Sequence, residues 1–197
     1  GEYTRAIEVY ATTRVLCARV GDPYHQALCD LDQAEIYLEL NLVEEGSELA
    51  GMAYDAFRNL EMGYEAAKAL AFLAMAVSKE RRTEQALRWF DQSRQLFVEQ
   101  GNAFWPQLID LYKAILFHDL GEHEEARRLA ERSLPLFEGA GQIGKAALCG
   151  LLLARIALED GAVSRARARC VGSRRAVEGA DLPARACQAR LVMGQVA

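Results

Sequence analysis

Apolar residues recur along the chain at steps of three and four, which is the spacing of one face of an α-helix. The stretch LIDLYKAILFHDL places Leu108, Leu111 and Ile115 in this way, and ARRLAERSLPLF shows the same spacing. Leu, Ala, Glu and Arg are abundant and there are only 4 Pro, a balance that favours helix and leaves few candidates for strands. The pattern predicts an all-α fold.

The helical pattern repeats at a step of 40 residues, visible as four ladders of similar residues. Two ladders consist only of Ala and Gly, a third is built around three Phe, and a fourth is mostly Leu. Their members are Ala6, Gly46, Ala86, Ala126 and Ala166; Ala34, Ala74, Ala114, Ala154 and Gly194; Cys17, Phe57, Phe97, Phe137 and Val177; and Leu31, Ala71, Leu111, Leu151 and Leu191. Such self-similarity is typical of helical-repeat proteins.

Another set of positions, 20 residues apart, marks the ends of the helices. Most of them hold Gly or Asn, the residues that readily enter the left-handed conformation with which helices end. Each repeat is therefore predicted to be two helices of about 18 residues, roughly 27 Å long. Because Glu61 and Arg81 break the rule, we expect their corners to lack a left-handed residue. The positions are Gly1, Gly21, Asn41, Glu61, Arg81, Gly101, Gly121, Gly141, Gly161 and Asp181.

The two ladders of Ala and Gly, the small ladders, have a structural meaning, because antiparallel helices that cross closely tolerate little more than Ala at the contact. The ladder built around three Phe, the bulky ladder, then fills the space between successive helix pairs. Stacking predicts a right-handed superhelical solenoid of about ten helices, with a concave and a convex face. We expect one array: a half repeat at 1–20, repeats at 21–60, 61–100, 101–140 and 141–180, and a half repeat at 181–197. Since both ends fall within a repeat, we expect a fragment of a longer protein.

The stretch LYKAILFHDLGEHEEARRLAERSLPLF resembles a tetratricopeptide repeat, with a small residue at Ala114, an aromatic at Phe117, a turn at Gly121 and a second small residue at Ala126. GEYTRAIEVY fits the second-helix half of the motif. The usual repeat has about 34 residues, and its Leu-Gly pair reads Lys113-Ala114 here. The longer form resembles arrays attached to bacterial signalling ATPases of the maltose-activator type and to caspase-like (CHAT) proteases.

The resemblance implies that the first helix of each pair lines a concave groove in which a peptide or protein binds. Apolar positions in the middle of that groove would suit an amphipathic helix or an extended peptide. Solvated surface is the alternative for each position. The first-helix positions are Asp32, Glu35, Glu39, Phe72, Met75, Lys79, Tyr112, Ile115, Asp119, Arg155 and Glu159.

Trp105, beside Pro106 at the start of a first helix, is a further candidate anchor, because exposed Trp is often an interface hot spot. Packing between repeats is its alternative. The Lys/Asn/Arg clamp by which chaperone-binding relatives hold a peptide carboxylate is absent from this sequence. Its absence disfavours a ligand held by its C-terminal carboxylate.

The charge is uneven along the chain. Residues 161–197 hold seven Arg against Glu178 and Asp181, which gives +5, so the total of −5 leaves −10 for residues 1–160. Arg165 and Arg167 are two residues apart, a spacing that spreads them around a helix. Aromatic residues do not interleave with the arginines. We therefore expect a solvated helix surface, and we do not expect nucleic acid as a partner.

Catalytic motifs are not found: the sequence has no phosphate-binding loop, nucleophile elbow or dinucleotide fingerprint. Thr13, Ser93, Ser133 and Ser173 recur at the step of 40, which indicates packing at a helix contact. His118 and His123 flank the Gly121 turn among acidic residues, but no zinc-binding spacing supports a metal. We expect a solvated polar turn there, no metal, no cofactor and no enzymatic activity.

The five cysteines show no C-x-x-C pairing and lie within apolar helical patterns, so we expect buried free thiols in a reducing compartment. Arg155 interrupts the best apolar run, which leaves no candidate for a membrane span. The sequence thus predicts a soluble, cytoplasmic interaction scaffold or regulatory sensor that binds a peptide, a partner protein or an adjoining domain. A small-molecule or signal-peptide receptor of a bacterial regulator is the alternative.

Overall fold

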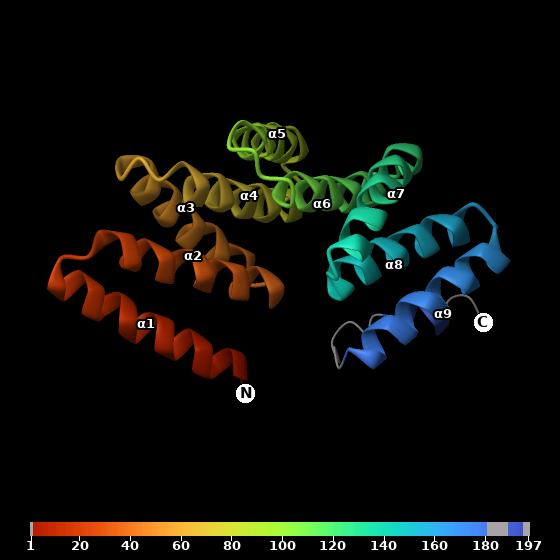
Figure 1. The fold of residues 1–197 in the computed structure, drawn as a ribbon, viewed down its shortest axis with the longest axis horizontal. Helices are drawn as coiled ribbons and strands as arrows, with labels where there is room; N and C mark the ends of the chain where they lie inside the picture. The colour runs from red at the N-terminus through yellow and green to blue at the C-terminus, as the bar shows by residue number, and fades with distance from the viewer. Residues whose placement is uncertain (1, 181–188, 195–197) are drawn as a thin grey trace. The chain divides into compact units, whose positions relative to one another are not determined.

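The computed structural model describes residues 2–180 and 189–194, and over those residues it contains helices and no strand (Figure 1). A further helical segment covers 189–194. Among the described residues, no helix combines the length and the apolar character that crossing a membrane requires. The helices are α1 (Glu2–Val20), α2 (Pro23–Glu39), α3 (Val43–Asn59), α4 (Gly63–Lys79), α5 (Thr83–Glu99), α6 (Trp105–Asp119), α7 (His123–Gly139), α8 (Ile143–Glu159) and α9 (Val163–Gly179).

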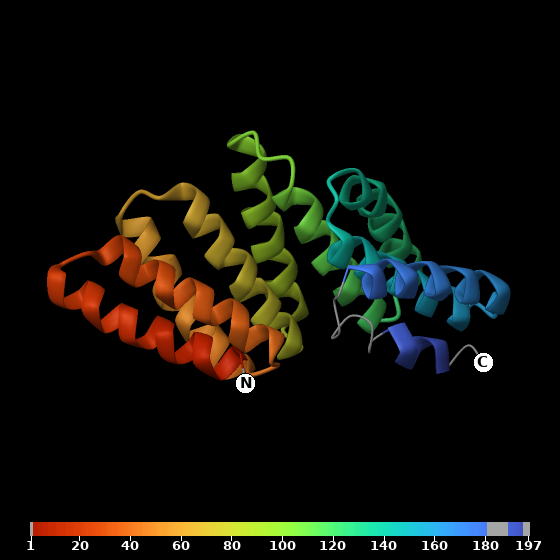
Figure 2. The same cartoon turned by 60° about the horizontal axis from the view of Figure 1, so that its bottom comes forward.

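The chain divides into two compact units, Gly1–Ile109 and Asp110–Ala197. Within the first unit, helices that follow one another along the chain are antiparallel and lie side by side from α1 to α5 (Figure 2). The second unit repeats this arrangement in α7, α8 and α9. The all-α fold of sequential antiparallel helix pairs is confirmed.

Every corner between consecutive helices contains one residue with a positive φ, at steps of 20 residues from Gly21 to Gly161. At the Gly121 corner, the amide of Glu122 donates to the Phe117 carbonyl over 2.8 Å, the hydrogen bond that closes a helix C-terminus. The spacing of the corners from Gly21 to Gly161 was therefore predicted correctly, while the predicted positions Gly1 and Asp181 lie outside the described residues.

The expectation for Glu61 and Arg81 was wrong, because both adopt the left-handed conformation, at φ 58° and 61°. Their corners make the same closing bonds: the amide of Met62 donates to Phe57 over 2.9 Å, and that of Arg82 to Val77 over 3.1 Å. The repeat geometry imposes the backbone angle, and the side chain bears the steric cost.

The small ladders lie where helices cross. A Cβ added to Gly46 on α3 would come within 2.9 Å of Leu38 Cγ and 3.4 Å of the Ala34 carbonyl oxygen on α2. Ser93 on α5 is fully buried and donates its hydroxyl to the Ala67 carbonyl on α4 over 2.6 Å. Packing at a helix contact, predicted for this serine ladder, is confirmed at Ser93.

The bulky ladder forms the core of each unit. Phe57 and Phe97 are buried in the first unit, and Phe137 and Val177 in the second. At the ends of the ladders the burial falls: Cys17 is half-buried, and Leu191, whose counterparts are all buried, is 69% exposed.

Candidate functional site

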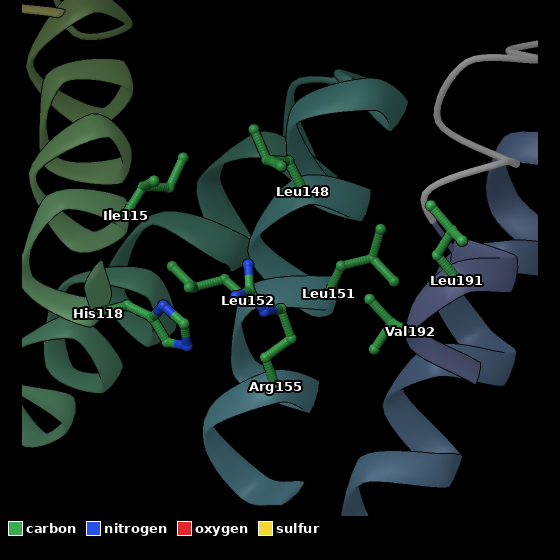
Figure 3. A pocket seen from close by; sticks show the side chains of 8 residues that line it. All are labelled: Ile115, His118, Leu148, Leu151, Leu152, Arg155, Leu191 and Val192. Atoms are coloured by element: carbon green, nitrogen blue, oxygen red, sulfur yellow. The ribbon is translucent and has the colours of Figure 1, made fainter. Parts of the chain in front are cut away.

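The second unit contains a pocket of about 300 Å³ between α6, α8 and the helical segment 189–194 (Figure 3). In Figure 3, α6 contributes the residues on the left, α8 those in the centre and the segment 189–194 those on the right. Of the eight lining residues in the described part of the chain, six are aliphatic, and the polar ones are a histidine and an arginine. This composition is typical of ligand pockets, which are mostly apolar with a few placed polar groups. The lining residues are Ile115, His118, Leu148, Leu151, Leu152, Arg155, Leu191 and Val192.

The apolar wall follows from the sequence of α8, which carries Leu148, Leu151 and Leu152 within a helix that is apolar on several sides. A helix in the middle of a stack packs against neighbours on more than one side, so it needs apolar residues around its axis. Leu151 and Leu152 are buried, whereas Leu148 is half-buried and borders the opening. The wall therefore combines packed leucines with apolar surface left accessible.

Arg155 is the permanent cation of the pocket, and its side chain is exposed. It belongs to α8, where Glu159 lies four residues further on. No carboxylate within residues 2–180 and 189–194 forms an ion pair with it. Together with Ile115, it is one of two predicted groove residues that the structure places in this pocket.

The Glu159 carboxylate contacts two histidines of α6 and α7. Its Oε2 lies 3.3 Å from Nε2 of His118 and 3.2 Å from Nε2 of His123. The two imidazole rings are stacked, with centroids 5.6 Å apart. His118 Nδ1 also lies 3.3 Å from Asp119 Oδ1. The distances allow ion pairing when an imidazole is protonated, but the Nε2 atom of His118 has no well-aligned hydrogen bond.

The expected solvated polar turn is therefore only partly correct. His123 is half-buried, but His118 is buried, because the α6 face that carries it packs toward α8. Among the described residues, no group of three or more His, Cys, Asp or Glu side chains is arranged to hold a metal ion.

In the first unit, Lys68 on α4 bridges two of the predicted groove acids. Its Nζ lies 3.6 Å from both Asp32 Oδ1 and Glu35 Oε2 on α2, and 5.4 Å from the centroid of the Phe72 ring. Phe72 is only 1% exposed, so it is a core residue and not a surface anchor. Phe72 was predicted to lie in the groove because helical spacing alone does not say which face of α4 is covered.

Three other predicted groove residues of the first unit lie at or near the surface. Met75 is half-buried and Glu39 is exposed. Lys79 is exposed and donates to Asn41 Oδ1 over 2.6 Å, a bond from the end of α4 to the corner before α3. None of the three lines the pocket of the second unit.

Trp105 is buried, with 7% of its surface exposed, so it is not available as a surface anchor. Its ring stacks on Phe97 with centroids 5.0 Å apart and planes 8° apart. Its indole N–H donates to the Tyr64 hydroxyl over 2.8 Å. Packing between repeats, the alternative for this residue, is what the structure shows.

Two predicted groove residues of α6 lie outside the pocket. Tyr112 is half-buried, and the ammonium of Lys145 on α8 lies 6.0 Å from its ring centroid. Asp119 is exposed and contacts His118.

Six of the described pocket residues were not predicted from the sequence. Leu151 and Leu191 belong to the leucine ladder, so the repeat pattern predicted core positions for them and did not indicate that they line a pocket.

Four cysteines among the described residues are free thiols, and Cys187 lies outside those residues. Cys29, Cys149 and Cys170 are buried as predicted, while Cys17 is half-buried. Burial raises the pKa of the Cys149 thiol to about 12 and also raises the pKa of Cys170. Thiols of this kind stay protonated near neutral pH and are poor nucleophiles.

Comparisons with known proteins show which known fold the chain shares. No protein-family model matches the sequence, and no curated protein is significantly similar to it. The chain is similar to a solved structure titled "Crystal Structure of the Apo Form of RapI", with a TM-score of 0.72 and 17% sequence identity. The similarity covers 92% of this chain and 66% of that chain, so this chain spans slightly less than two thirds of its length. At this identity the likeness shows a shared fold of helical repeat pairs.

Proposed function

We propose that this chain is a non-enzymatic helical-repeat module that binds a peptide or a segment of a partner protein. The observation that carries the proposal is the pocket on the first helices α6 and α8, whose apolar lining is open to solvent at Leu148 and Leu191. Accessible apolar surface with a few polar groups around it favours binding. The similarity to RapI supports the repeat architecture on which such a site is built.

We further infer that the repeats belong to the tetratricopeptide family in its longer, 40-residue form. The support is the step-40 ladders, the corners at steps of 20 and the close crossing at Gly46. Because the longer form resembles arrays attached to signalling ATPases or proteases, an adjoining effector domain of a longer protein is one partner that the module would bind.

The proposal of no enzymatic activity and no cofactor is supported by the state of two side chains of nucleophilic type. The hydroxyl of Ser93 is buried and bonded to a backbone carbonyl, and the thiol of Cys149 is buried with a raised pKa. Free thiols favour a reducing compartment, so we place the module in the cytoplasm. The Arg-rich α9 lacks aromatic side chains, which argues against nucleic acid as the partner.

A small-molecule or signal-peptide receptor of a bacterial regulator is the second candidate function. It is favoured by the pocket volume of about 300 Å³, which lies at the lower end of the range for small-ligand sites. Saturable thermal stabilisation by a compound, without any peptide binding, would select this function over the first.

The test is selection of displayed random peptides on the immobilised 197-residue chain, followed by affinity measurement on two variants. Leu148→Glu places a charge in the pocket wall, and Leu136→Glu places the same charge on the exposed surface of α7. We expect saturable binders whose affinity Leu148→Glu abolishes and Leu136→Glu leaves unchanged. Binders that do not distinguish the two folded variants, or no binders at all, would contradict the proposal.

A further inference from the structure

The guanidinium of Arg155 borders an apolar pocket without a carboxylate partner among the described residues. Other cations beside buried surface are paired: Arg14 with Asp30, and Arg132 with Asp110. A guanidinium presents up to five N–H donors in a planar fork, which matches a carboxylate. Arg155 is therefore a donor group whose hydrogen bonds are open to a ligand.

The natural partner of Arg155 on its own helix would be Glu159, since side chains four residues apart are neighbours on a helix. However, the Glu159 carboxylate is turned toward α6 and α7, where Oε2 contacts both His118 and His123. The histidine pair thus competes with Arg155 for the only carboxylate within one turn of α8 on its C-terminal side.

The charges around the pocket select for an anion. Arg155 and His118 are its polar lining residues, and among the residues that the structure describes no acidic side chain lines it. A cationic ligand would meet the guanidinium, and a neutral polar one would lose hydrogen bonds to water without a charged partner in return. An apolar ligand that also carries a carboxylate satisfies both the aliphatic walls and the arginine.

We propose that the pocket takes a partner-protein segment in which an Asp or Glu stands next to a large aliphatic residue. The aliphatic side chain contacts Ile115, Leu148 and Leu152, and the acidic side chain pairs with Arg155. This inference rests on the proposed peptide-binding function and adds the chemistry of the ligand. The absence of a C-terminal carboxylate clamp from the sequence places the acid within the segment and not at its end.

The test begins with a peptide selected on the chain from a display format that leaves no free C-terminus. That peptide is synthesised as the C-terminal amide, once with its Asp and once with Asn instead. Both forms are titrated against the wild type, Arg155→Glu and Arg175→Glu, a matched charge reversal on the exposed face of α9. Circular dichroism checks that the variants fold.

On the wild type, we expect the Asn form to bind about tenfold more weakly than the Asp form, the loss of one charged hydrogen-bonded contact. Arg175→Glu keeps this difference, while Arg155→Glu removes it. Selected peptides without acidic residues, or an Asp-to-Asn ratio that Arg155→Glu does not change, overturn the inference. In that case the proposed function still stands if Leu148→Glu abolishes binding, and it fails together with the inference if binding survives that change.

Discussion

Glu159 Oε2 lies 3.3 Å from Nε2 of His118, so a carboxylate at the end of α8 lies beside a buried imidazole of α6. The same carboxylate reaches His123 on α7. One side chain therefore links three helices of the second unit and leaves Arg155 without its helical neighbour.

Glu159→Ala is expected to weaken this junction by about 1 kcal/mol, a modest value because the Glu159 side chain is 41% exposed. Native-state hydrogen exchange of the α6 and α8 amides measures the change in opening free energy. Glu131→Ala, on the exposed surface of α7, is the control. Equal protection of α8 in both variants would show that the contact contributes nothing.

Replacement of the two left-handed residues tests the corner geometry. Glu61→Gly and Arg81→Gly should each stabilise the first unit by about 0.5–1 kcal/mol, because Gly reaches a positive φ without the Cβ clash. Both tryptophans, Trp89 and Trp105, lie in this unit, so urea unfolding followed by tryptophan fluorescence reports on it. A lower midpoint for either variant would mean that the side chain contributes more than the strain costs.

The sequence predicted the repeat architecture because its signals are periodic. The Gly and Asn corners and the Ala and Gly crossings recur at a fixed step, and one exceptional residue does not remove that period. Glu61 and Arg81 were misjudged because intrinsic preference was weighed without the helix-to-helix geometry that fixes φ at those positions. The cost of the left-handed conformation, about 1–2 kcal/mol for a residue with a Cβ, is outweighed when the packing of the two flanking helices requires that backbone angle.

The site was harder to predict from the sequence because two helical faces can look alike. Ile115 and Arg155 were placed correctly, while Phe72 and Trp105 belong to the core. An apolar residue on a first helix can point into the stack or into the groove, and composition does not separate these cases. His118 was assigned to a solvated turn because the sequence does not show that α8 covers it.

The contact between Trp105 and Tyr64 gives a sharp test of packing between repeats. Tyr64→Phe leaves the buried indole N–H without its acceptor, which should cost about 1–2 kcal/mol. Tyr54→Phe is the control, because within residues 2–180 and 189–194 no hydrogen bond is seen to this hydroxyl of α3. Urea unfolding followed by tryptophan fluorescence measures both. Identical midpoints for the two variants would rule out a contribution from the hydrogen bond.

The buried carboxyl of Asp30 makes the stability of the first unit depend on pH. Burial raises the pKa of Asp30 above its ordinary value of 3.8, and the hydrogen bond from Arg14 only partly offsets this effect. The folded state therefore holds this proton more tightly than the unfolded state. Stability attributable to Asp30 is present below pH 3.8 and is lost as the pH rises through the raised pKa.

Asp30→Asn removes this proton linkage, so the wild type should lose stability relative to the variant as the pH rises above about 4. Urea titrations of both proteins between pH 3 and 7, followed by tryptophan fluorescence, give the difference. A wild type that gains stability relative to the variant over this range would show that Arg14 outweighs burial.

The binding site can be located directly by nuclear magnetic resonance of the chain with labelled Ile, Leu and Val methyl groups, titrated with the selected acidic peptide. We predict saturable shifts at Ile115, Leu148 and Leu152, and none at the exposed Val9 and Leu16 of α1. Shifts confined to α1, or no saturable shift at the pocket methyls, would contradict a module that binds its partner in the pocket between α6 and α8.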